Sequence, residues 1–136
     1  MFFLILACFS LSNLAKAVNP PPDGVYPAGN TAEGFQALQS RTTGGFNTAL
    51  GGQALFSDTD GSLNTATGLR AIFSNTSGSG NTATGVYSLY NNSVGNNNTS
   101  GGIYSGYSNT NGGTNTAFGA YSLVNNISGN NNTAVG

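Results

Sequence analysis

An Asn-Thr pair recurs seven times along this chain, each time 17 residues after the previous one. The seven asparagines are Asn30, Asn47, Asn64, Asn81, Asn98, Asn115 and Asn132. No insertion or deletion interrupts the series. A short, constant period is typical of one small structural unit stacked on copies of itself. The spacing therefore predicts a repeat domain over residues 30–136, in which the seventh copy is incomplete.

Two columns of glycine keep the same period. We number each repeat from its asparagine, which is position 1. Position 5 is glycine in every copy: Gly34, Gly51, Gly68, Gly85, Gly102, Gly119 and Gly136. Position 15 is glycine in all six complete copies: Gly44, Gly61, Gly78, Gly95, Gly112 and Gly129. Each would cost a helix roughly 0.8–1 kcal/mol relative to alanine, so helical repeats are disfavoured. Sharp turns with positive φ explain both glycine columns better, and stacked asparagine amides are expected to hydrogen-bond from coil to coil.

Apolar residues alternate at positions 6, 8 and 10 of the repeat, as in Leu69, Ala71 and Phe73. Together with the Ala at position 3, this pattern predicts two short strands per repeat. The expected fold is all-β: a parallel β-solenoid of stacked 17-residue coils, with a rod length of roughly 30 Å for six coils. Such a coil has a narrow interior, so we expect several chains to share a core.

The N-terminal residues predict an exported protein. Residues 1–17 read as a signal peptide, with a mainly apolar run and a cleavage site at Ala15-Lys16-Ala17, although no basic residue precedes that run. Lipid attachment at Cys8 is the alternative. Residues 18–29 hold all four prolines and form a leader or a cap on the first coil. The chain stops five residues into a repeat, which predicts a fragment of a longer protein that is secreted or exposed at the cell surface.

The composition argues against nucleic-acid binding, a cofactor, a metal site and catalysis. Charged residues make up 5% of the chain, the formal net charge is −1 and there is no His, so we expect neither nucleic-acid binding nor a cofactor. The only Cys lies in the predicted signal peptide. Asp58 and Asp60 are expected to be solvated in a turn, which does not suit a catalytic pair. A calcium-binding roll would need Asp in every coil. We therefore predict no metal site and a non-enzymatic protein.

Two features suggest binding. Tyr87, Tyr104 and Tyr121 occupy position 7 of consecutive coils, where they would face a carbohydrate or a flat ligand, or simply stack as a structural ladder. The structural interpretation is favoured. Thr-x-Thr pairs at 65/67 and 82/84 suggest an ice-binding solenoid, but position 4 is not threonine in the other coils.

The Asn-Thr-Ala-x-Gly columns over residues 30–136 resemble the head repeats of trimeric autotransporter adhesins of the YadA-like class, although here the period is longer. The resemblance implies a left-handed β-roll and a homotrimer. It also implies the head or shaft of a surface adhesin or fibre, acting by multivalent contact with a host surface, glycan or matrix ligand. Membrane attachment would need a segment absent from this chain. A structural self-assembling matrix or fibre protein without a specific ligand remains the main alternative, and an ice-binding solenoid the other.

Overall fold

Residues 27–136 form one continuous solenoid in the computed structural model, which does not describe residues 1–26. The predicted signal peptide and most of the proline-rich leader therefore lie outside the described residues. A short 3-10 helix, η1 (Pro27–Gly29), precedes the first coil. Each coil then contributes one strand: β1 (Thr31–Glu33), β2 (Thr48–Leu50), β3 (Thr65–Thr67), β4 (Thr82–Thr84), β5 (Thr99–Gly101), β6 (Thr116–Phe118) and β7 (Thr133–Val135).

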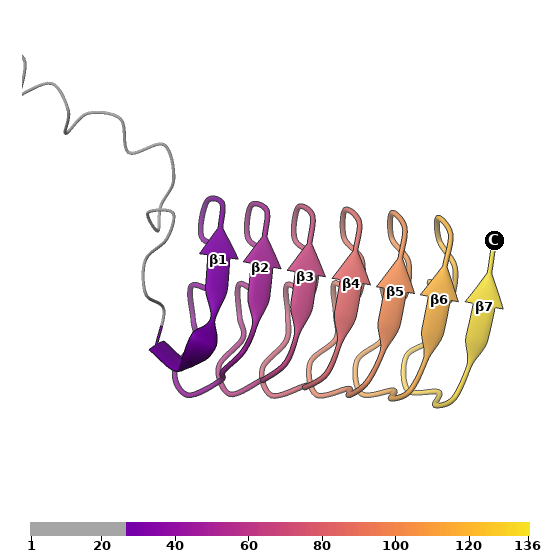
Figure 1. Ribbon diagram of the computed structural model, residues 1–136. Helices are drawn as coiled ribbons and strands as arrows, with labels where there is room; N and C mark the ends of the chain where they lie inside the picture. The colour runs from indigo at the N-terminus through magenta and orange to yellow at the C-terminus, as the bar shows by residue number, and fades with distance from the viewer. Residues whose placement is uncertain (1–26) are drawn as a thin grey trace, which may run out of the picture.

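The seven strands make one parallel sheet in chain order, and every neighbouring pair is in register at the repeat spacing (Figure 1). Thr31 is paired with Thr48 and Thr48 with Thr65, so equivalent residues of successive coils lie side by side. The all-β parallel solenoid expected from the spacing is confirmed. Because the register is constant, each position of the repeat becomes a straight column along the rod.

The second strand expected at positions 6–10 is absent from the described coils, which are built of turns there. Positions 7 and 9 are in the left-handed region, with φ of 57° at Gln53 and 51° at Leu55. This geometry is unusual for side chains larger than glycine. It still satisfies the backbone, because Gln53 N donates to Phe35 O at 2.8 Å in the preceding coil and Leu55 N donates to Ala71 O at 3.0 Å in the next.

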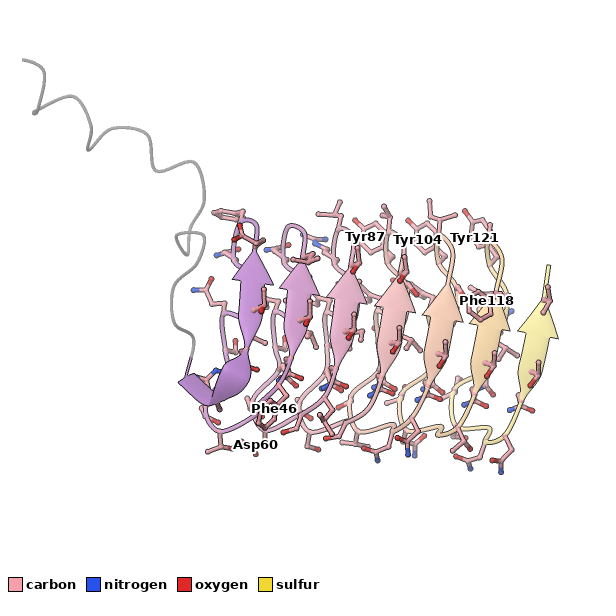
Figure 2. The ribbon with its side chains drawn as sticks, viewed as in Figure 1. Phe46, Asp60, Tyr87, Tyr104, Phe118 and Tyr121 are labelled. Carbon is pink, nitrogen blue, oxygen red and sulfur yellow. The ribbon has the colours of Figure 1, made fainter. Side chains whose placement is uncertain are left out.

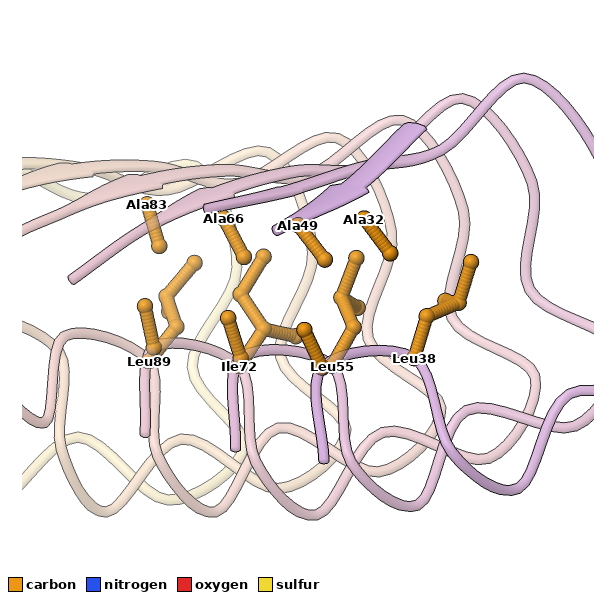
Figure 3. Close-up of a cluster of buried hydrophobic side chains, with 11 residues drawn as sticks. Ala32, Leu38, Ala49, Leu55, Ala66, Ile72, Ala83 and Leu89 are labelled. Atoms are coloured by element: carbon orange, nitrogen blue, oxygen red, sulfur yellow. The ribbon is translucent and has the colours of Figure 1, made fainter. Parts of the chain in front are cut away.

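The left-handed residues also change which side chains face inward. Strict alternation would bury positions 6, 8 and 10, but the adjacent positions 8 and 9 are the ones that are buried, as Ala54 and Leu55 show. Position 6 points outward, and Phe35 is 62% exposed. The Leu and Ile side chains of position 9 pack against the Ala column of the sheet (Figure 3). The apolar core is therefore a single narrow strip along the rod.

The two glycine columns have different causes. Position 5 has positive φ throughout, for example 131° at Gly68 and 137° at Gly85. Position 15 does not have positive φ, so the explanation expected from the sequence is wrong there. At this column the backbone lies against the next coil: a Cβ on Gly61 would be 2.6 Å from both Asn75 Nδ2 and Gly78 O. Position 15 needs glycine because no side chain fits.

Candidate functional site

The position-1 asparagines form a buried hydrogen-bonded column. Asn64 Oδ1 accepts the backbone N–H of Asn81 at 2.9 Å, and Asn81 Oδ1 does the same for Asn98 at 3.0 Å. Asn81 Nδ2 donates across its own coil to Gly95 O at 2.8 Å. Each amide thus satisfies one backbone group of the next coil and one of its own, which explains why the sequence holds asparagine at this position.

A second buried amide column runs along position 12, and sequence reasoning missed it. Its members are Asn75, Asn92, Asn109 and Asn126. In each of these coils Nδ2 donates to the position-15 carbonyl three residues later, at 2.9 Å for Asn75 and Gly78. The same amide also donates to Oδ1 of the preceding coil, at 2.8 Å from Asn109 to Asn92. The signal was present in the sequence, because these four asparagines also keep the 17-residue spacing.

Asp58 occupies position 12 of the second coil and joins this column. The expectation that it is solvated is wrong: its exposed fraction is 0%. Burial raises its pKa to about 7, against the lowering effects of hydrogen bonds from Asn75 and the Gly61 backbone. Asp60 is exposed in the turns at the opposite end of the coils from Tyr87 (Figure 2). Asp58 and Asp60 therefore do not form a pair in one cleft. Residues 27–136 contain no group of three or more His, Cys, Asp or Glu placed to hold a metal ion.

The tyrosines that the sequence suggests as a structural ladder or a ligand-facing surface form one of two stacked aromatic columns. Tyr87, Tyr104 and Tyr121 stack at position 7, with ring centroids 5.1 and 5.3 Å apart and planes within 12° of parallel. A second stack fills position 10, with successive centroids 5.0–5.2 Å apart: Phe56, Phe73, Tyr90 and Tyr107. Tilted contacts of 5.5 and 5.4 Å join the two columns.

Stacking along the rod restricts what these rings can bind. Both faces of Tyr104 are covered by the rings above and below it, so only its edge and hydroxyl remain for a ligand. A sugar that binds an aromatic side chain usually lies on the ring face. The geometry therefore favours the structural ladder over a carbohydrate platform. In the first three coils, polar side chains occupy the same position-7 column and hydrogen-bond from coil to coil. Arg70 Nε donates to Gln53 Oε1 at 2.7 Å, and Gln53 Nε2 donates to Gln36 Oε1 at 2.8 Å.

The outer surface of the sheet carries the threonines of the seven Asn-Thr pairs, including the Thr-x-Thr pairs at 65/67 and 82/84. We call positions 2 and 4 of β1–β7 the sheet face. Position 2 is threonine in all seven strands. None of these seven hydroxyls has a hydrogen-bond partner among residues 27–136, and all are exposed or half-buried. The threonines of position 13 differ, since Thr59 Oγ1 donates to Thr76 O at 2.8 Å and Thr76 Oγ1 to Ser93 O at 3.1 Å.

Position 4 completes the sheet face with mixed side chains. The exposed apolar members are Leu50, Phe118 and Val135, with exposed fractions of 38%, 48% and 81%. The Phe118 ring lies back over Gly101, at a point where a Cβ on that glycine would be 2.6 Å from the ring. Glu33 is the one charged residue within the sheet face. The surface is therefore nearly neutral, rich in hydroxyl and methyl groups, and repeated from coil to coil.

In comparisons with known proteins, no family model, no curated protein and no solved structure matches this chain. Within the part of the chain that the structure describes, no helix is long and apolar enough to cross a membrane.

Proposed function

We propose that this chain is an exported, non-enzymatic repeat module that serves as the head or shaft of a surface adhesin or fibre. Three copies assemble side by side through their sheet faces, and the other faces of the rod contact an extended host-surface, glycan or matrix partner at many equivalent points. The observation that carries the proposal is the row of seven position-2 threonines, whose hydroxyls have no partner among residues 27–136. Repeated weak contacts on a stiff rod sum to strong binding without a deep pocket.

The sheet face also supports assembly of copies. It combines free hydroxyls with exposed Leu50 and Phe118 and carries almost no charge. A second copy of the chain has the same coil spacing, so contacts made at one coil can recur at the next without mismatch. The narrow apolar strip inside each coil gives a further reason for association, because burying the sheet face would add apolar area at about 25 cal/mol per Å².

The first experiment is the solution mass of residues 18–136, measured by light scattering over a range of concentrations. The expected result is three times the chain mass. A matched pair of triple variants locates the contact: T65K/T82K/T99K charges the sheet face, and S77K/V94K/N111K charges the exposed position-14 column. The sheet-face variant should dissociate and the control should not. A wild-type monomer at high concentration would contradict the trimer, and an unaffected sheet-face variant would contradict this interface.

The same threonine row favours ice binding as a second candidate function. A parallel sheet with hydroxyls and methyls at about 4.8 Å intervals presents a regular array to ordered water. Position 4 interrupts that array with Glu33, Leu50 and Phe118, which is why adhesion ranks first. Measurement of thermal hysteresis separates the two functions. Ice binding would be favoured if the wild type shows hysteresis that T65K/T82K/T99K abolishes and S77K/V94K/N111K retains. The absence of hysteresis at millimolar protein would exclude ice binding.

A further inference from the structure

Asp58 stands in a column in which the other buried members are amides. In the coils of Asn75, Asn92, Asn109 and Asn126, the side chain uses its two ends differently. The Oδ1 of Asn75, Asn92 and Asn109 accepts from the amide of the following coil. Nδ2 donates to the carbonyl of the position-15 glycine. The position-15 carbonyl therefore accepts two hydrogen bonds, one from this side chain and one from the position-1 amide of its own coil.

The carboxyl of Asp58 reproduces only half of this pattern. Its Oδ1 accepts from Asn75 Nδ2 at 2.6 Å, as the Oδ1 of an amide would. Its Oδ2 corresponds to the nitrogen that donates to the position-15 carbonyl in the asparagine coils, and that carbonyl is Gly61 O in this coil. Asn47 Nδ2 lies between these two acceptors, 3.3 Å from Asp58 Oδ2 and 2.8 Å from Gly61 O. A proton on Oδ2 restores the missing donor, whereas a carboxylate places negative charge against a carbonyl dipole.

The charged groups near Asp58 are few. Asp60 in the same coil raises its pKa, and Arg41 at position 12 of the preceding coil lowers it; both effects are smaller than that of burial. The guanidinium of Arg41 is turned to the backbone, with Nη1 donating to Gly44 O at 3.2 Å. Asp60 Oδ1 accepts the hydroxyls of Thr42 and Thr43 at 2.9 and 2.8 Å. The following coil presents the neutral amide of Asn75. Among the described residues no basic side chain is hydrogen-bonded to Asp58, so a negative charge there is met only by the neutral amides of Asn75 and Asn47 and by the backbone of Gly61.

We propose that Asp58 is a pH-sensitive junction between the first two coils, residues 30–63, and the rest of the solenoid. The protonated carboxyl donates to Gly61 O and continues the amide column into the second coil. On ionisation the proton leaves to solvent, the donor is lost and a buried negative charge remains, so the two coils separate more readily from the third. This inference does not depend on the proposed adhesive role, since it concerns only the interior of the rod.

The sign of the pH dependence follows from the two states of the carboxyl. The pKa of Asp58 is raised to about 7 in the folded coil from the ordinary value of 3.8. The folded state therefore binds the proton more tightly than the opened state, and stability is greatest below about pH 4 and falls as pH rises toward 7. In this window the equilibrium constant for opening increases up to about tenfold per pH unit, and above it the dependence levels off.

The test uses the chain of residues 18–136 and its variant Asp58→Asn, which carries the residue that four later coils hold at position 12. Hydrogen exchange followed by NMR reports the opening of residues 30–63 relative to residues 81–118 between pH 4.5 and pH 7.5. After correction for intrinsic exchange, wild-type opening should rise at least tenfold across this range in the first region only. Asp58→Asn should abolish most of that rise. Asp60→Asn, which removes the exposed carboxyl two residues away, should leave it in place.

The carboxyl carbon of Asp58 gives a direct second readout. Its NMR shift should titrate with a midpoint well above that of an exposed aspartate. A midpoint near 4 would overturn the proposal, as would an equal pH dependence of opening in wild type and Asp58→Asn.

Discussion

The interior of each coil has two halves that achieve the same stacking by different chemistry. Behind the sheet, the Ala column packs against Leu55, Ile72 and Leu89, which are at most 2% exposed. At the other end of the coil, the two amide columns fill an equally dry space with hydrogen bonds. The apolar half accepts variation, since Gly106 replaces Leu and Ser105 replaces Ala in the fifth coil. The amide half varies less, because each side-chain atom there has a specific hydrogen-bond partner in the backbone or in the next amide of the column.

Removing one buried amide should have the largest effect. In Asn81→Leu, the backbone N–H of Asn98 loses its partner in a space that excludes water. The carbonyl of Gly95 keeps only the amide of Asn92, and the side-chain amide of Asn98 loses one of its acceptors. At 1–3 kcal/mol for the unsatisfied N–H and about 1 kcal/mol for each of the other two lost hydrogen bonds, we expect a loss of about 4 kcal/mol in the free energy of unfolding, measured by urea titration. The control is Asn125→Leu at an exposed asparagine, which should change stability by less than about 0.5 kcal/mol. Equal losses in the two variants would contradict the distinction.

Cavity formation in the apolar half should cost somewhat less. Ile72→Ala removes a fully buried side chain and should lower the free energy of unfolding by about 3 kcal/mol, for lost burial and the space left behind. Leu69→Ala lies in the same coil, but its side chain is 46% exposed, so its loss should stay within about 1 kcal/mol. The pair is measured in the same urea titration. A loss for Ile72→Ala as small as that for Leu69→Ala would mean that the narrow strip contributes little to stability.

A change of one atom tests the amide half more finely. Asn92→Asp keeps the shape of the side chain but removes, when ionised, the donor to Asn75 Oδ1 and Gly95 O. Desolvation should raise the pKa of the new carboxyl, so stability is retained at low pH and lost as pH rises. We expect a loss of about 2 kcal/mol at pH 7 that largely disappears at pH 4. Asn125→Asp, at an exposed position, is the matched control and should show no such dependence.

The sequence predicted how the coils stack, but not which side chains of each coil point inward. The 17-residue period determined the parallel register and the columns, because a constant spacing leaves no other way to stack equivalent residues. It did not show that positions 7 and 9 adopt positive φ, because Gln53, Leu55 and Ile72 are residue types that rarely do so. This is why a second strand was expected and position 6 was assigned to the interior. Asp58 was judged by its residue type, as a solvated turn residue, and its membership of the position-12 column went unnoticed.

In the candidate site, too, the sequence predicted the columns of residues but not the geometry of their side chains. The spacing placed Tyr87, Tyr104 and Tyr121 in one column, but only the ring geometry reveals that neighbouring rings stack and cover both faces of Tyr104. The threonines of position 2, which have no hydrogen-bond partner among residues 27–136, and the hydrogen-bonded threonines of position 13 are indistinguishable by residue type. They differ in whether a carbonyl of a neighbouring coil lies within reach of the hydroxyl, as Thr76 O does for Thr59 at 2.8 Å. That property depends on side-chain direction, which the period does not report.

The smallest effect is expected outside both halves, in the aromatic column. Tyr104→Gln introduces a residue that the same column already holds at Gln36 and Gln53, where the amides bond to each other at 2.8 Å. The loss in the free energy of unfolding should be about 1 kcal/mol, and a double-mutant cycle with Tyr121→Gln should give a coupling of about 0.5–1.5 kcal/mol for the stacked pair. A coupling near zero would show that the rings do not stabilise one another, despite centroids 5.3 Å apart. If Tyr104→Gln left stability intact but abolished binding to a glycan or matrix ligand, the ring edges and hydroxyls would be the ligand-contact surface of the rod.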